Sequence, residues 1–345
     1  MRLSRCLREA QVSGLLDTFA YLDYTSHQKK NMSMRHHLIA FFLIAAACLT
    51  PVSMARQALP RTPDGQPDLQ GIWTNATLTP LERPPELRSK EFFTPQEALA
   101  YEKQARERTH GDRRDSDPEA DLTVGYNDFW WDRGTKTVST GRTSIIVDPP
   151  DGRIPPLTPE AQKKAAARAQ ARALHPADGP EDRSLADRCI MRANPPMLPA
   201  GYNNNYQIVQ AVGYVVILME MMHDARIIPL DGRPHLPANV RQLLGNPHGH
   251  WEGNTLVVET TNFTDKTNFR GSGENLSLVE RFTRIDKDTL LYQFTVEDPE
   301  SFVRPWSGEI PMKKTDGPIF EYACHETNYS MTNMLSSARA EERAR

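Results

Sequence analysis

The sequence has no apolar run long enough to cross a membrane as a helix, which takes about 20 residues. Its longest apolar stretch, residues 38–49, contains only 12 residues. Arg35 precedes this stretch, and the small residues Ser53 and Ala55 follow it at the spacing that a signal peptidase recognises. A basic start, a short apolar segment and a small-x-small exit are typical of a secretory signal peptide. We therefore expect a periplasmic or secreted protein without a stable membrane span.

The signal peptide sets the first domain boundary. We expect a leader over residues 1–55, with the true start at Met32 or Met34, because a signal peptide normally begins its chain. Two alternatives stay open for this segment: a buried core helix over residues 38–49, and lipidation at Cys48.

Cysteine is scarce after the leader, where Cys189 and Cys324 are the only two of the four in the chain. Export makes a disulfide possible, and two distant cysteines pair more simply than they bind a metal. Neither belongs to a Cys-x-x-Cys motif, so a redox role is not expected. We predict a Cys189–Cys324 disulfide, which would restrict the unfolded chain.

Neither sign of charge is in large excess, since 41 Lys and Arg residues accompany 44 Asp and Glu residues, for a net charge of −3. Without a basic patch the chain is not expected to bind nucleic acid. The sequence also lacks a phosphate-binding loop, a dinucleotide-binding fingerprint and a Gly-x-Ser-x-Gly motif. We therefore expect a small molecule as the partner, and no cofactor.

Short β-branched and aromatic runs dominate the second half of the chain, and no helix between them is long enough for parallel crossovers. This pattern predicts an antiparallel meander over residues 181–345 that closes into a calycin- or lipocalin-like barrel, because closure removes strand edges. Residues 56–180 should form an extended and helical wrap within the same domain. The predicted strands are residues 143–147, 206–210, 214–222, 225–229, 255–263, 276–285, 290–297, 303–312 and 319–325.

A few peripheral helices are predicted beside this mostly β fold. Thr94 and Glu97 form a capping-box pattern around Pro95, so a helix should run to about residue 108. A second helix should span residues 158–174, and a short third one residues 237–244.

Several charged residues lie within the predicted strands. Those that face solvent need no partner, whereas those that point inward must pair with one another or shape a polar cavity, because a buried unpaired charge is costly. The residues concerned are Glu220, Glu259, Glu280, Arg281, Glu309 and Glu321.

Residues 223–252 hold the densest group of candidate catalytic side chains. We predict His235 or His250 as the proton-transfer group, since a histidine oriented by a carboxylate such as Asp231 can exchange protons near neutral pH. Arg226 or Arg233 could hold an anionic substrate group through a bidentate contact. Trp251 and Glu280 complete the predicted substrate site. The structural alternative is that Asp231 caps a turn and Arg233 forms a salt bridge.

A metal site is a weaker alternative in the same segment. His248 and His250 would share one face of a strand, and Glu252 would continue that face. A tight turn at Glu252 and the irregular sequence around Asn246 and Pro247 weaken this interpretation.

Four segments resemble a large group of exported bacterial proteins of unassigned function, namely residues 143–152, 226–235 (RIIPLDGRPH), 249–258 (GHWEGNTLVV) and 279–284. The resemblance spans nearly the whole chain after the leader and implies export and a β-rich fold. It implies no activity, ligand or catalytic residue. Asn254 departs from the group's turn, where Asp is usual, which affects turn chemistry alone.

Two functions follow as expectations. The first is a cofactor-independent lyase, isomerase or hydrolase that uses acid/base catalysis in a barrel cavity. The alternative is a periplasmic binding or carrier protein without catalysis, which needs a cavity lined by aromatic side chains. The candidates for that lining are Trp130, Trp131, Trp251, Tyr292 and Phe294. Residues 126–131 hold four aromatics that either pack as core or lid, or stack on a ligand.

Overall fold

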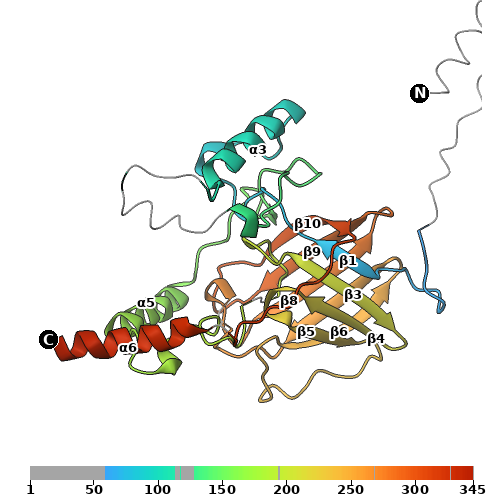
Figure 1. Cartoon of the computed structure of the whole chain (residues 1–345). Coiled ribbons are helices and arrows are strands. Elements are labelled where there is room, and N and C mark those ends of the chain that lie inside the picture. The colour runs from blue at the N-terminus through green and yellow to red at the C-terminus, as the bar shows by residue number, and fades with distance from the viewer. Residues whose placement is uncertain are drawn as a thin grey trace, which may run out of the picture. The chain divides into compact units, whose positions relative to one another are not determined.

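A single antiparallel sheet forms the centre of this computed structural model, which describes residues 59–112, 117, 128–192, 195–267, 269–326 and 328–344. The predicted signal peptide lies outside the described residues. Among the described residues the sheet has ten strands: nine follow the order β5-β4-β3-β1-β10-β9-β8-β7-β6, and the tenth, β2, pairs with β10 (Figure 1). All pairings are antiparallel, which confirms the predicted mostly β, antiparallel fold. The strands are β1 (Gly71–Thr74), β2 (Ile146–Asp148), β3 (Asn205–Ala211), β4 (Tyr214–Met219), β5 (Ala225–Pro229), β6 (Asn246–Glu252), β7 (Thr255–Thr261), β8 (Ser277–Arg284), β9 (Thr289–Glu297) and β10 (Trp306–Thr315).

The two end strands of the sheet, β5 and β6, approach each other through side chains. A Cβ atom on Gly249 of β6 would lie 2.9 Å from Ile228 Cγ2 of β5 and 2.7 Å from Leu230 Cδ2, so glycine allows this close approach. Backbone hydrogen bonds do not join β5 to β6 among the described residues. The predicted closure into a barrel is therefore not confirmed.

The interior of the coiled sheet is filled by every second residue of its strands, as the two-residue period of a β-strand requires. On β9, Leu290, Tyr292, Phe294 and Val296 are at most 1 % exposed. The Phe294 ring lies against Gly308 of β10, where a Cβ atom would be only 2.3 Å from Phe294 Cζ. Other large buried members of the same apolar cluster are Trp73, Met197, Ile208, Ile217, Phe263, Phe282, Phe302 and Trp306.

In the described part of the chain, three long helices lie outside the sheet (Figure 1). Helix α3 (Pro95–Thr109) begins with the predicted capping box between Thr94 and Glu97. Helix α5 (Pro159–Leu174) confirms the second predicted helix, whereas α6 (Tyr329–Ala344) was not predicted. None of the described helices is both long and apolar enough to span a membrane.

Two predicted elements are wrong. Residues 237–244 form turns rather than a helix, because the Asn262 side chain donates hydrogen bonds to the carbonyls of Leu236, Pro237 and Val240. Residues 319–325 form no strand. Their backbone is held instead by a disulfide and by the Glu220 carboxylate, which accepts a hydrogen bond from the Phe320 amide at 3.1 Å.

Candidate functional site

Arg226 and Glu280, which the sequence suggested as substrate-binding residues, form an ion pair inside the sheet. Arg226 extends inward from β5 and donates through both terminal nitrogens to the Glu280 carboxylate on β8, with Nη1 3.0 Å from Oε1. The second nitrogen also donates to Thr260 Oγ1 at 3.3 Å. Both charged side chains are at most 2 % exposed. Of the charged strand residues that the sequence singled out, Glu280 thus points inward and is paired, but its partner Arg226 was not in that set. The pair joins β5 to β8 across the interior.

Two tyrosines extend this buried polar network. Tyr292 donates its hydroxyl proton to Glu280 at 2.8 Å and accepts the Met197 amide at 2.9 Å. The Asn75 side chain donates to the Met197 carbonyl at 3.0 Å and to the Tyr206 hydroxyl at 3.3 Å. Burial raises the pKa values of both tyrosines, so both hydroxyls keep their protons at neutral pH. Most polar atoms of this network therefore form hydrogen bonds with other members of the network.

Asp231 and Arg233 lie on the surface and bind each other. The Arg233 guanidinium donates to both carboxylate oxygens of Asp231 and to the Tyr214 hydroxyl at 3.0 Å. These hydrogen bonds lower the pKa of Asp231 to about 2. Asp231 also accepts the backbone amide of Arg233 at 3.2 Å, as an Asx turn requires. The geometry matches the structural alternative for this turn.

Three histidines gather on the outer surface of β6. Because Gly249 faces the interior, its neighbours His248 and His250 point outward. The rings of His235 and His248 lie 4.3 Å apart, and His235 Nδ1 is 3.3 Å from the Asn246 side-chain oxygen. His235 thus contacts Asn246 and not the predicted partner Asp231, whose carboxylate binds Arg233. Burial lowers the pKa of His248, whose Nδ1 is 2.8 Å from the Arg233 carbonyl.

His250 belongs to a short chain of charged groups. Its Nε2 lies 3.2 Å from Glu252 Oε1, and Arg281 donates to Glu252 Oε2 at 2.7 Å. These two hydrogen bonds lower the pKa of Glu252. No group of three or more His, Cys, Asp or Glu side chains in the described part of the chain is arranged to hold a metal ion.

The predicted site is therefore divided by the wall of the sheet. Arg226 and Glu280 are inside, while His250 and the Asp231–Arg233 pair are outside. Trp251, another predicted substrate-binding residue, packs against the apolar core with a buried Nε1 that has no hydrogen-bond partner among the described residues. The structure brings His235, His248 and His250 to one region, but it does not gather the whole predicted set in one pocket.

A different hollow is lined by three exposed aromatic side chains. We call it the aromatic groove; it encloses about 1310 Å³ where β3 begins and β4 ends. Phe129, Trp130 and Phe320 line it and are 83, 56 and 62 % exposed. The other lining residues are Thr74, Trp131, Asp132, Ala186, Asp187, Arg192, Tyr202, Asn203, Asn205, Glu220, Thr315, Glu321, Tyr322, Ala323, Cys324, Asn328 and Ser330.

Packing and a covalent bond fix the walls of the aromatic groove. The Trp131 ring lies on Gly201, where a Cβ atom would be 2.5 Å from the ring, and the Arg133 guanidinium lies 3.6 Å from the ring centroid. The predicted disulfide is present, with Cys189 and Cys324 joined at a Cα–Cα distance of 5.7 Å. It ties the segment that carries Phe320 to the segment before β3.

Acidic side chains outnumber basic ones in the aromatic groove. Asp132, Asp187, Glu220 and Glu321 carry carboxylates, whereas Arg192 is the one cation among the described lining residues. Glu220 is 2 % exposed and accepts two backbone amides, from Asn205 at 3.2 Å and from Phe320 at 3.1 Å. Burial and the nearby charge of Glu220 raise the pKa of Asp132. Carboxylates are therefore in excess among the described lining residues.

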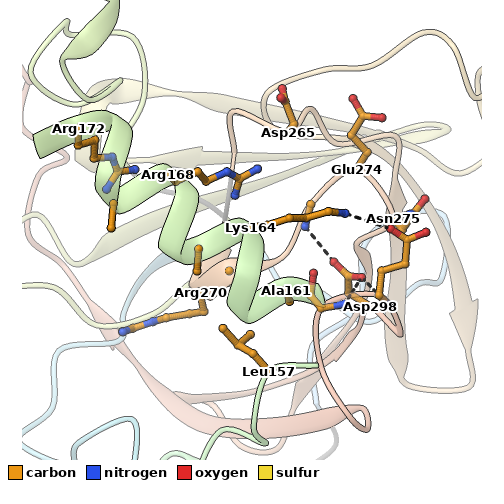
Figure 2. Close-up of a pocket in the computed structure, with 16 residues that line it drawn as sticks. Leu157, Ala161, Lys164, Arg168, Arg172, Asp265, Arg270, Glu274, Asn275 and Asp298 are labelled. Carbon is orange, nitrogen blue, oxygen red and sulfur yellow. Dashed lines mark hydrogen bonds and ion pairs between the residues drawn. The ribbon is translucent and has the colours of Figure 1, made fainter. Parts of the chain in front are cut away.

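A second hollow, of about 590 Å³, lies against α5 (Figure 2). Its lining contains equal numbers of basic and acidic side chains, and it lacks large aromatics. Asp298 is used structurally, because it accepts backbone amides from Gly273 and Ser301 at 2.9 and 3.1 Å. Lys164 on α5 faces Glu300 at 3.8 Å. This balanced surface lacks the exposed aromatic side chains of the aromatic groove.

The sequence indicated ligand stacking by residues 126–131 as one alternative, and Trp130 and Trp131 as candidates for a cavity lining, but it did not indicate the other residues of the groove. The run alone does not distinguish core packing from ligand stacking, and its partners come from segments near residues 190, 220 and 320. No family model matches this chain, and no curated protein or solved structure shows significant similarity to it.

Proposed function

We propose that this chain is an exported ligand-binding protein and that its small-molecule ligand lies in the aromatic groove. The observation that carries this proposal is the exposure of Phe129, Trp130 and Phe320 around one hollow. A large aromatic side chain buries roughly 150–250 Å² when it is packed. Three such side chains exposed together form an apolar surface that a ligand would cover, as in most small-molecule sites.

Export is part of the proposal and is supported by two features. The sequence carries a signal-peptide pattern before residue 56, and the disulfide forms a wall of the groove. A disulfide persists in an oxidising compartment such as the periplasm. The binding site would therefore be complete only after export and oxidation.

The interior of the sheet supports binding less well than the groove does. The side chains once expected to line a cavity there, such as Tyr292 and Phe294, are at most 1 % exposed and pack against one another at a ring distance of 5.8 Å. Trp130 and Trp131, which were expected to line the same cavity, line the aromatic groove instead. We therefore propose that the ligand binds in the aromatic groove, where β3 begins and β4 ends.

A ligand screen with the oxidised chain lacking its leader tests the proposal. Tryptophan fluorescence and thermal stability would be followed across a library of small metabolites. We expect at least one compound to bind, and the Phe129→Ala/Trp130→Ala variant to lose about tenfold or more in affinity, which is about 1.4 kcal/mol. Phe92→Ala is the matched control, because Phe92 is an exposed aromatic outside the groove. Equal affinity in both variants would refute the groove as the site.

Acid/base catalysis is a second candidate function, favoured by the His250–Glu252–Arg281 chain. A carboxylate that bonds an exposed imidazole can orient it for proton transfer. We would expect a substrate-dependent activity that His250→Gln abolishes and Glu252→Gln reduces. Retained activity in His250→Gln would rule out this role.

A further inference from the structure

The aromatic groove combines two features that recognise the same chemistry. One is the set of aromatic faces, which attract a cation through the negative potential above the ring. The other is the excess of carboxylates over the single lining cation, Arg192. An ammonium group flanked by both features gains from each of them, whereas a carboxylate or phosphate would be repelled.

Only part of the negative charge of the groove is paired with a cation among the described residues. Asp187 has an ion-pair partner, since Arg183 lies 3.3 Å from its carboxylate. Arg192 points to Tyr202, donating to the hydroxyl at 2.6 Å. The buried Glu220 carboxylate is bonded by neutral backbone amides, and no cationic side chain of the described residues forms an ion pair with it. A buried carboxylate without a counter-ion is costly, so a bound cation would stabilise it.

Two cation–aromatic contacts already exist at this end of the sheet. The Arg133 guanidinium carbon lies 3.6 Å from the Trp131 ring centroid, and that of Arg192 lies 5.2 Å from the Tyr202 ring centroid. The rings of Phe129 and Trp130 pack edge to face at 5.1 Å and are more exposed. Their faces are therefore the ones available to a ligand.

We infer that the ligand of the aromatic groove is an organic cation, whose ammonium group lies among Phe129, Trp130 and the Asp132 and Glu220 carboxylates. This inference rests on the proposed function and specifies its ligand class. The aromatic side chains supply contact area, and the carboxylates select the charge. The groove, of about 1310 Å³, accommodates a small molecule with an apolar body around a positive centre, such as a quaternary ammonium compound.

Three molecules of one branched shape but different charge provide the test. They are choline, the uncharged 3,3-dimethylbutan-1-ol and the anionic 3,3-dimethylbutanoate, each titrated into the oxidised chain without its leader and followed by NMR. We expect choline to bind at least tenfold more tightly than the alcohol and the anion not to bind. The preference for choline should weaken in Asp132→Asn, while affinity for the alcohol stays unchanged.

A matched control separates local charge from net charge. Asp64→Asn makes the same change, Asp to Asn, at an exposed turn outside the groove. The neighbouring Arg61 donates a hydrogen bond to Asn254 at the β6–β7 turn. The Asp64→Asn variant should leave choline affinity unchanged. Equal binding of choline and the alcohol would overturn the cation inference but leave the binding function intact. No binding by any of the three, together with no hit in the metabolite library, would overturn both.

Discussion

Aromatic and charged side chains occupy two contrasting regions of this protein, the interior of the sheet and the aromatic groove. Inside, Trp73 and Trp306 are fully buried, and the Arg226–Glu280 pair satisfies its charges internally. In the groove, Phe129 and Trp130 are mostly exposed, and the carboxylates outnumber the cations. The same residue types stabilise the fold in the first region and are available to bind in the second.

The largest effect should come from breaking the interior ion pair. Glu280→Ala leaves the Arg226 guanidinium buried without a counter-ion, which typically costs about 3–5 kcal/mol. We expect urea unfolding to show a loss of that size. The matched control is the double replacement Arg226→Met/Glu280→Leu, which removes both charges and should recover much of the loss. A loss below about 1 kcal/mol in Glu280→Ala would show that the pair is not desolvated.

Tryptophan truncations sharpen the contrast between the two regions. Trp306→Ala should lower the free energy of unfolding by about 3–5 kcal/mol, because it leaves a large cavity in the core. Trp130→Ala should change it by no more than about 0.5 kcal/mol, since the side chain is exposed. Thermal unfolding of both variants measures the difference. Equal losses would mean that Trp130 is part of the packed core.

The disulfide links the stability of the fold to the shape of the groove. Replacing Cys189 and Cys324 by serine should lower the free energy of unfolding by about 2–4 kcal/mol, because the bond closes a long loop in the unfolded chain. The same variant should bind ligand more weakly, since the bond anchors the wall that carries Phe320. Chemical unfolding and ligand titration test the two effects. Unchanged ligand affinity would show that Glu220 alone holds this wall.

Much of the fold could be predicted from local sequence patterns. Strand β5 and helices α3 and α5 match their predicted ranges closely, since turn residues and caps mark their ends. The disulfide could be predicted because only two cysteines follow the leader. Closure of the barrel could not be predicted, because pairing between β5 and β6 depends on how the whole sheet coils.

The candidate site could not be predicted, because its parts are distant in the sequence. Residues 319–325 have the apolar character of a strand, but Cys324 and Glu220 hold them as an irregular wall. Local clustering favoured residues 223–252 instead, yet Arg226 enters the interior while His248 and His250 face outward. Successive side chains of a strand point to opposite faces of the sheet, so residues that are neighbours in the sequence are separated in space. A short sequence motif does not show this separation.

The smallest expected effect concerns pH and the surface histidines. The folded pKa of His248 is lowered by burial, so the unfolded chain binds a proton at a higher pH than the folded chain does. Its contribution to stability is therefore present above the unfolded pKa of about 6.5, and it is lost as pH falls through the folded pKa. We expect stability to decline slightly on acidification below pH 6.5, and His248→Asn to flatten that decline. An unchanged slope in His248→Asn would contradict this assignment.

The most direct test of the account follows the indole N–H signals of the five tryptophans during titration with choline. Single Trp→Phe variants would assign the signals. The account predicts that Trp130 and Trp131 shift on binding, whereas Trp73, Trp251 and Trp306 keep their positions. Shifts confined to the latter three, which would place the ligand inside the sheet, or no shift at all, would contradict it.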